Sequence, residues 1–221
     1  MSATICALLA RMADSVNAEL HIFRSARLES VALEAIDFLT KSQLYNLPPS
    51  SRFIGVGVYA LYYLGDSEHY KHIVELNKAN CVHPIYVGKA VPAGWRTARN
   101  PKTKNLGLLG RLREHTKSIE QGTGLDVADF RCRFIILQEN EADLITAVEA
   151  QLIRLSMPIW NTLIDGFGNH TPGKRRFTQS LSEWDVLHPG RSWAEKLTGP
   201  RPSLETILKK LETHRQLSSS A

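Results

Sequence analysis

Residues 57–63 read Gly-Val-Tyr-Ala-Leu-Tyr-Tyr, and residues 84–89 read Pro-Ile-Tyr-Val-Gly-Lys. Both stretches are short, rich in β-branched and aromatic residues, and bounded by glycine or proline, which is typical of half-buried strands. Successive side chains of a strand point to opposite faces, so Tyr59 and Tyr86 each point away from the apolar residues beside them. One tyrosine hydroxyl from each strand can therefore converge on a common polar site.

The composition is typical of a soluble globular protein with one sizeable core. The chain has 221 residues, of which 43% are hydrophobic and 22% are charged, and these fractions are ordinary for such proteins. No run approaches the ~20 apolar residues of a membrane span, and the first residues lack the basic segment of a secretory signal. Three cysteines without paired spacing predict a reducing compartment, the bacterial cytoplasm, and neither a disulfide framework nor a zinc site.

Positive charge is concentrated in one segment of the chain. The net charge is +5, from 27 Lys and Arg against 22 Asp and Glu. Residues 89–117 contain eight of these bases and a single acid, Glu114, so the whole positive excess lies directly after the second strand. A nucleic-acid backbone is the natural partner of such a stretch. The alternative is a solvated loop and helix face without a partner.

Hydrophobic periodicity predicts an α/β (α+β) fold with a small, mostly antiparallel central sheet flanked by helices. A third strand is expected at residues 130–138, where apolar side chains alternate with other residues. Helices are expected at residues 3–45, 67–80, 105–120, 141–156, 191–197 and 203–216. We divide the chain into an N-terminal helical arm (1–50), which offers packing or dimerisation surface, a core (51–165), and a C-terminal loop with a helical extension (166–221).

Four polar residues stand out on these elements. Arg111 and His115 are spaced i, i+4 beside the apolar stripe of one predicted helix. Glu149 lies at the edge of the apolar stripe of the next helix, where a carboxylate is partly desolvated unless it is paired. Asn161 follows the Met157-Pro158 break that ends this helix. Taken singly, each has an ordinary structural interpretation as part of a surface pair, a helix acid or a turn cap.

The order of these residues resembles that of the GIY-YIG nuclease superfamily. In that superfamily two strand tyrosines precede an arginine with a nearby histidine, a metal-binding glutamate and an asparagine. The matching residues of this chain are Tyr59, Tyr86, Arg111, His115, Glu149 and Asn161. The resemblance covers about residues 55–165 and implies a catalytic core there. Val58 and Val87 stand where the family motif has isoleucine, and both exchanges are conservative.

Three further segments resemble the small type II restriction endonucleases of this superfamily and extend the likeness to about Leu197. They are residues 84–95, 165–173 and 184–191. The resemblance implies Mg²⁺-dependent cleavage of double-stranded DNA, with Mn²⁺ as an alternative ion, at a short GC-rich palindrome such as CCGCGG. It also implies a homodimer and a cognate DNA methyltransferase as genetic partner.

The residue types suit phosphodiester hydrolysis, which needs an activated water and stabilised charge on the phosphate. Glu149 offers a hard oxygen ligand for Mg²⁺, and Arg111 can hold a phosphate oxygen through its guanidinium fork. The resemblance makes Tyr59 the activator of the water, yet a free tyrosine has a pKa of about 10 and is a poor base at neutral pH. Either nearby positive charge lowers that pKa, or His115 relays the proton.

The remaining functional expectations concern orientation and DNA contact. Tyr86 is expected to orient the water or the phosphate, and Asn161 to hold Glu149 or the phosphate. After the second strand, the candidates for phosphate contact are Lys89, Arg96, Arg99, Lys102 and Lys104. In and after the glycine-rich segment, the candidates for phosphate or base contact are His170, Lys174, Arg175 and Arg176. The alternatives are a homing or repair-type GIY-YIG endonuclease and, outside the enzymes, a DNA-binding protein that does not cut.

Overall fold

The computed structural model describes residues 17–219 apart from residues 24, 93, 95–105 and 174–175. The strands are β1 (Tyr45–Asn46), β2 (Gly57–Tyr63), β3 (Tyr86–Ala90) and β4 (Phe130–Ile136). The α-helices are α2 (Ala26–Lys41), α3 (Lys71–Asn77), α4 (Gly107–Gln121), α5 (Ile145–Ser156), α6 (Ile159–Thr162), α7 (Glu183–Leu187) and α8 (Leu204–Ser219). Short 3₁₀ helices are η1 (Ala18–His21), η3 (Val127–Asp129), η4 (Glu139–Leu144) and η5 (Ala194–Lys196). The predicted α+β class is confirmed.

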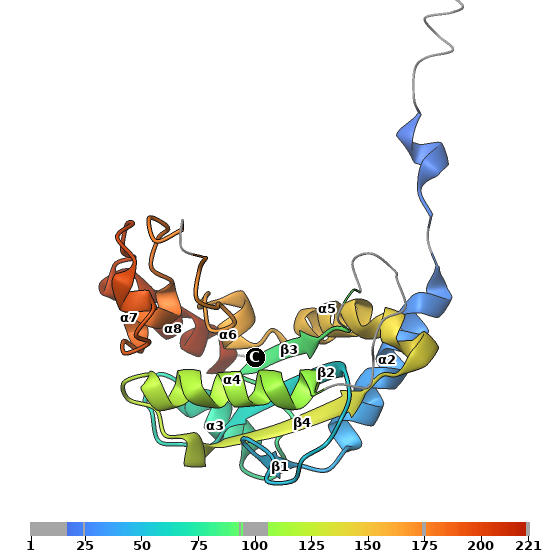
Figure 1. Ribbon diagram of the computed structural model, residues 1–221, viewed down its shortest axis with the longest axis horizontal. Helices are drawn as coiled ribbons and strands as arrows, with labels where there is room; N and C mark the ends of the chain where they lie inside the picture. Colours follow the sequence, from blue (N-terminus) through green and yellow to red (C-terminus); the bar gives the residue numbers. More distant parts are fainter. Residues whose placement is uncertain (1–16, 24, 93, 95–105, 174–175, 220–221) are drawn as a thin grey trace, which may run out of the picture.

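The strands form one antiparallel sheet in the order β1-β4-β2-β3 (Figure 1). β2 lies in the middle and is buried along its whole length, whereas β3 stands at an edge. The first residue of β2 has to be glycine. Gly57 has a φ of +152°, and a Cβ added there would collide with the carbonyl oxygen of Ile135.

Helices cover both faces of the sheet (Figure 1). On one face, α2 and α5 pack over the β2 side chains Val58, Ala60 and Tyr62. On the other face, α4, α3 and the C-terminal helices enclose Tyr59, Leu61 and Tyr63. The alternation expected for β2 is therefore confirmed, and each face of the sheet has its own apolar core.

Two predicted helices are shorter than expected, and in each case tertiary contacts form just beyond one end. The expected 3–45 helix is α2, which ends at Lys41, and Tyr45–Asn46 instead pair with β4 as a short edge strand. Residues 1–16 of that expectation lie outside the described residues. The expected 67–80 helix is α3 alone, since Tyr70 just before it is turned into the core by hydrogen bonds to other elements.

The segment expected as one helix over 141–156 begins as the 3₁₀ helix η4 and becomes α-helical only at α5. The apolar spacing along α5 predicts that Leu155 is buried with Val148 and Leu152, but its side chain is 56% exposed, so this prediction is wrong. Near the C-terminus, α7 was not expected, because a five-residue helix is too short to show periodicity. The expected 191–197 helix is reduced to η5, whereas α8 confirms the last one.

The C-terminal helices belong to the same core as the tyrosine face of β2. Trp184 of α7 and Ile207 and Leu211 of α8 are buried in the apolar cluster that contains Tyr59. In Figure 1 these helices form the orange-to-red group beside α4 and α6. This packing places the glycine-rich segment after α6 directly against the tyrosine face.

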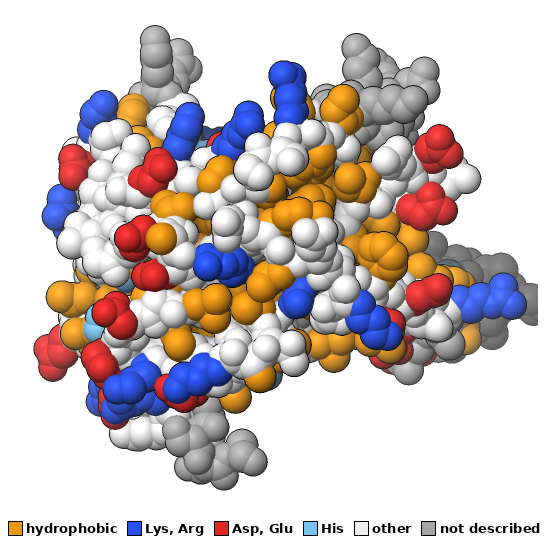
Figure 2. All heavy atoms as spheres, turned by 90° about the horizontal axis from the view of Figure 1, so that it is seen from below, with side chains coloured by type: hydrophobic (Ala, Val, Ile, Leu, Met, Phe, Trp, Pro, Cys, Tyr) orange, Lys and Arg blue, Asp and Glu red, His pale blue; other side chains and the backbone are white. Residues whose placement is uncertain are grey.

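On the face of the molecule shown in Figure 2, Lys and Arg side chains are interspersed with Asp, Glu and apolar side chains. The described residues of that face therefore form no continuous positive surface for a phosphate backbone. None of the helices in the described part of the chain is both long enough and apolar enough to span a membrane.

Candidate active site

The first pair of functional side chains consists of Tyr59 and His115. Tyr59 lies opposite Gly88 in the pairing of β2 with β3, and a Cβ on Gly88 would collide with the Tyr59 hydroxyl group. The missing side chain leaves room for that hydroxyl, which lies 2.6 Å from Nε2 of His115 on α4. Position 88 of β3 is thus a glycine because any larger side chain would collide with Tyr59 of β2.

The surroundings of this pair decide which partner carries the proton. Tyr59 is fully buried, and its burial raises its pKa well above the usual range, although the positive charge of Arg111 opposes the shift. Burial, and then the charge of Arg111, lowers the pKa of His115 well below its usual range. At neutral pH the phenol is therefore protonated and the imidazole is neutral, so the imidazole nitrogen is the available proton acceptor of the pair.

Tyr86 completes an aromatic wall around His115. Its ring lies edge-on to the His115 ring, with centroids 5.0 Å apart. Phe167, from the glycine-rich segment, stacks on the His115 ring, with centroids 4.6 Å apart and an interplanar angle of 19°. The next residue is Gly168, where a Cβ would come 2.5 Å from the Tyr86 hydroxyl oxygen. Burial raises the pKa of Tyr86 to about 12, so this hydroxyl also keeps its proton at neutral pH.

Arg111 lies one helical turn before His115, and its partners on the protein include Glu114 and His170 as well as Tyr59. One guanidinium nitrogen donates to the Glu114 carboxylate at 2.7 Å and is in hydrogen-bonding contact with Nε2 of His170. The Arg111 side chain is 23% exposed, so it remains accessible from solvent. The contact with His170 joins the helix to the glycine-rich segment, 59 residues further along the chain.

Glu149 of α5 reaches the site from the opposite face of the sheet and is paired with Lys89 of β3. The Lys89 ammonium lies 2.6 Å from Oε2 of Glu149, and the two side chains are 31% and 16% exposed. The pairing satisfies the requirement that a desolvated carboxylate at this position have a partner. It also shows that a cation fits against Glu149.

The donor set fits a magnesium ion bound through one carboxylate. No cluster of three or more His, Cys, Asp or Glu side chains occurs among the described residues. Among the described residues, Glu149 would thus hold such an ion through a single carboxylate, with waters and phosphate oxygens in the rest of the coordination shell, as is common for Mg²⁺.

Several of these side chains share one cavity of about 560 Å³. It is lined by Tyr86, Lys89, Arg111, Glu114 and Glu149, together with apolar and glycine residues in or next to β3 and α4. The cavity thus brings residues from both faces of the sheet together at the edge strand β3. The sequence placed these side chains on their elements, and the structure brings them together.

Asn161 has a different place from the one expected. Its side-chain oxygen accepts a hydrogen bond of 2.8 Å from the backbone N–H of Val87, and its amide nitrogen donates one of 2.9 Å to the Val87 carbonyl. Both polar groups of the amide are therefore used by β3 rather than by Glu149. Asn161 fixes the strand that carries Tyr86 and Lys89.

The candidates for DNA contact are only partly described. Arg96, Arg99, Lys102, Lys104, Lys174 and Arg175 lie outside the described residues. Lys89 is paired with Glu149, and His170 contacts Arg111. Arg176 lines a separate hollow of about 330 Å³ with Asn169, His170 and Gln179. His170 therefore links this hollow to the side chains around Arg111.

Sequence reasoning missed Phe167 as a member of the site. Phe167 was quoted within the segment 165–173, but a single apolar residue in a loop gives no periodic signal that it packs on a histidine 52 residues earlier in the chain. It likewise missed the pairing of Asp185 with Arg191, which holds that segment. The available signal was the resemblance of both segments to restriction enzymes.

The comparisons with known proteins agree with this geometry. The family model described as the Eco29kI GIY-YIG domain matches residues 51–215, about three quarters of the chain, and this range includes all of the candidate catalytic residues. The comparison with curated proteins found no match. The protein is therefore a nuclease, and its chain belongs to the Eco29kI GIY-YIG domain family, a restriction endonuclease family of the GIY-YIG type.

Proposed function

We propose that the protein is a type II restriction endonuclease that cleaves a short, GC-rich palindromic site in double-stranded DNA with one Mg²⁺ in each active site. The observation that carries the proposal is the convergence of the Tyr59–His115 pair, Arg111 and Glu149 around the edge strand β3. A neutral proton acceptor, a cation for the phosphate and a hard oxygen ligand are the groups that phosphodiester hydrolysis requires.

Tyr59 and His115 act together in the proposed mechanism. Attack of water on phosphorus forms one P–O bond and breaks the bond to the leaving sugar oxygen. The leaving oxygen takes up a proton from solvent water, and the attacking water must lose one. Because Tyr59 is itself protonated, it can take that proton only as its own passes to Nε2 of His115, 2.6 Å away. His115 is then the final base and Tyr59 the relay, which favours the second of the two alternatives raised by the sequence.

In the proposed mechanism, Arg111 and Glu149 stabilise the negative charge on the phosphate. The guanidinium fork of Arg111 is suited to a non-bridging phosphate oxygen, and its position on the wall of the cavity gives access to one. Glu149 would hold Mg²⁺, which when bound supplies Lewis-acid stabilisation of the negative charge that develops on the phosphate. Lys89 would then leave Glu149 and could contact a phosphate, as the sequence predicts.

Cleavage of both strands of a palindrome is most simply achieved by a homodimer, since each chain carries one such site. Exposed apolar side chains of the N-terminal arm, including Leu20, Phe23 and Phe38, offer a surface for that contact. A restriction role also implies a cognate methyltransferase that protects the host DNA. Cys81 and Cys132 are free and buried, in keeping with a reducing cytoplasm.

The decisive experiment is incubation of the purified protein with methylation-free plasmid and phage DNA, in Mg²⁺ and in EDTA, beside Glu149→Gln. Discrete fragments that require Mg²⁺ and are absent with the variant support the proposal, and sequencing of their ends gives the site. Nicking or random degradation would contradict site-specific restriction. DNA binding without cleavage, equal for both proteins, would leave a DNA-binding module on a nuclease fold.

A further inference from the structure

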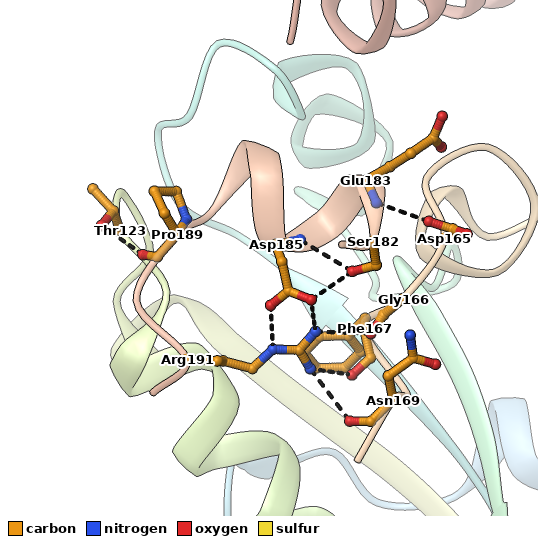
Figure 3. Close-up of polar contacts among 10 residues, drawn as sticks. All are labelled: Thr123, Asp165, Gly166, Phe167, Asn169, Ser182, Glu183, Asp185, Pro189 and Arg191. Carbon is orange, nitrogen blue, oxygen red and sulfur yellow. Dashed lines mark hydrogen bonds and ion pairs between the residues drawn. The ribbon is translucent and has the colours of Figure 1, made fainter. Parts of the chain in front are cut away.

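Arg191 is a buried arginine whose donors are all used, and it lies outside the residues discussed for catalysis. Its side chain is 1% exposed. Two of its nitrogens donate to the two carboxylate oxygens of Asp185, at 2.6 and 2.7 Å. The remaining N–H groups donate to the backbone carbonyls of Gly166, Phe167 and Asn169 at 2.9, 3.1 and 3.4 Å (Figure 3). A guanidinium has five N–H donors, so none is left over.

Tryptophan rings also pack on the planar guanidinium group of Arg191. The guanidinium carbon of Arg191 lies 4.6 Å from the ring centroid of Trp184 and 4.7 Å from that of Trp193. Asp185 is held in turn by the hydroxyl group of Ser182 at 2.6 Å. The ion pair is thus fixed in one geometry by neighbours on every side.

Stability alone is a weak reason for such an arrangement. A buried ion pair loses its hydration, and apolar replacements of similar size are often as stable or more so. The segment around α7 also has other anchors, including Trp184 in the core and the ion pair of Glu183 with Lys210 of α8. What Arg191 adds is three hydrogen bonds to one short stretch of backbone, residues 166–169.

That stretch of backbone carries the groups that surround the candidate base. Phe167 is stacked on the His115 ring and meets the Tyr86 ring edge-on, with centroids 4.8 Å apart. Gly168 gives the Tyr86 hydroxyl its room. Directly after the stretch, His170 contacts Arg111. A shift of the 166–169 backbone would therefore move the partners of His115, Tyr86 and Arg111 at the same time.

We propose that Arg191 and Asp185 are a positioning pair for the active site: by holding the 166–169 backbone they set the orientation of His115 toward Tyr59 and place His170 beside Arg111. Neither residue touches the reacting atoms, so both act through the loop. The cleavage part of the test rests on the proposed function, whereas the geometry of His115 can be followed without DNA. Misplacement of a catalytic group by about 1 Å costs on the order of a hundredfold in rate.

The test compares Arg191→Lys and Asp185→Asn with the matched control Glu183→Gln. Arg191→Lys keeps the charge but loses the planar fork, and Asp185→Asn keeps the size but loses the charge. Glu183→Gln breaks an ion pair on the same helix without touching the 166–169 backbone. For each protein, thermal unfolding, single-turnover cleavage at saturating DNA, DNA affinity and the imidazole NMR signals of His115 are measured well below the unfolding temperature.

Arg191→Lys and Asp185→Asn are expected to lose roughly tenfold to a hundredfold in cleavage rate, to change DNA affinity less, and to shift the His115 signals. The titration of His115 should also change, since Arg111, His170 and Arg191 are the charged or titratable groups that lower its pKa besides burial. Glu183→Gln should lower the unfolding temperature while leaving the rate and the His115 signals as in the wild type.

Wild-type rates and His115 signals in either folded variant of the pair would overturn the proposal. Rate losses that follow the unfolding temperature in all three variants, Glu183→Gln included, would also overturn it. If Arg191→Lys does not fold, Asp185→Asn alone decides. If the wild type cuts no DNA, the proposed function fails by itself, and the His115 signals of the free proteins still decide whether the pair positions the ring.

Discussion

The ammonium of Lys89 lies 2.6 Å from the carboxylate of Glu149, the residue proposed to hold magnesium. The pair joins β3 to α5, and both side chains are partly buried, at 31% and 16% exposure. In the free protein Lys89 therefore occupies one side of the carboxylate that a metal ion needs. A bound ion has to displace the ammonium or share Glu149 with it.

Replacing Lys89 by Met should strengthen Mg²⁺ binding to the free protein. The substitution removes a competing cation, and a partly exposed ion pair is worth up to about 1 kcal/mol, so we expect an affinity up to about fivefold higher. Calorimetric titration with Mg²⁺ measures this, with Lys89→Arg as the control that keeps the charge. An affinity that falls in Lys89→Met would mean that the ammonium orients Glu149 rather than competing for it.

Tyr59→Phe and His115→Gln should each lower the cleavage rate by roughly 10²–10⁴-fold, the usual contribution of a positioned proton-transfer group. Because the two residues form one proton path, the double variant should be hardly slower than the slower single variant. Single-turnover assays of the four proteins give the comparison. Losses that multiply in the double variant would show that the two residues act separately.

The lowered pKa of His115 predicts that its imidazole stays neutral over the physiological pH range. Burial and the charge of Arg111 lower its pKa well below the usual range, so its NMR signals should not titrate between pH 8 and about 6. The fraction of active protein should then not fall as the pH drops through 6.5. If His115 titrated near pH 6.5, it would not be the neutral acceptor for the Tyr59 proton that the mechanism requires.

Gly88→Ala should damage both folding and cleavage. The added Cβ would collide with the Tyr59 hydroxyl and ring, and overpacking of this kind costs about 1–3 kcal/mol in free energy of unfolding. Gly110→Ala on α4 is the matched control for folding only, since its Cβ meets nothing within 4 Å but Gly110 lines the candidate cavity. That substitution should raise helix stability by about 0.5–1 kcal/mol. Denaturant unfolding and cleavage assays separate the two.

Acid should weaken the anchoring of the C-terminal helices through His188. Burial lowers the pKa of His188 to about 4, and its Nε2 lies 2.6 Å from the Tyr70 hydroxyl. The unfolded chain takes up a proton below pH ~6.5 and the folded chain only near 4, so stability is complete above 6.5 and falls between these values. The loss reaches about 3 kcal/mol.

The free energy of unfolding at pH 7 and at pH 4.5 tests this role of His188. The difference between the two values should be smaller in His188→Gln than in the wild type, although the variant is less stable at pH 7. An equal difference in both proteins would assign the acid sensitivity to other groups.

The elements that the sequence predicted well are those with a regular pattern. β2, β3 and β4 alternate on two faces, and α4 has an apolar stripe long enough to be recognised, so Tyr59, Tyr86, Arg111 and His115 were placed on the right segments. The order of these residues then sufficed for the resemblance. β1 and α7 were not predicted, because elements of two and five residues are too short to show a periodic pattern.

The contacts between segments could not be predicted, because they depend on how loops far apart in the sequence pack together. Asn161 was expected at Glu149 or the phosphate, yet its amide pairs with the Val87 backbone. The ion pair of Lys89 with Glu149 of α5 was likewise not predicted, because it depends on the packing of α5 against β3. Periodicity gives the face of each side chain but not the partner that another segment brings to that face.

The pairing of Asn161 with Val87 also bears on solubility. β3 is an edge strand, and an edge with free N–H and C=O groups is a template for another strand from a second molecule. The Asn161 amide occupies both backbone groups of Val87, the second residue of β3, and so imitates one residue of a neighbouring strand. At this point of β3 the Asn161 amide therefore leaves no free backbone groups to which a strand of a second molecule could bind.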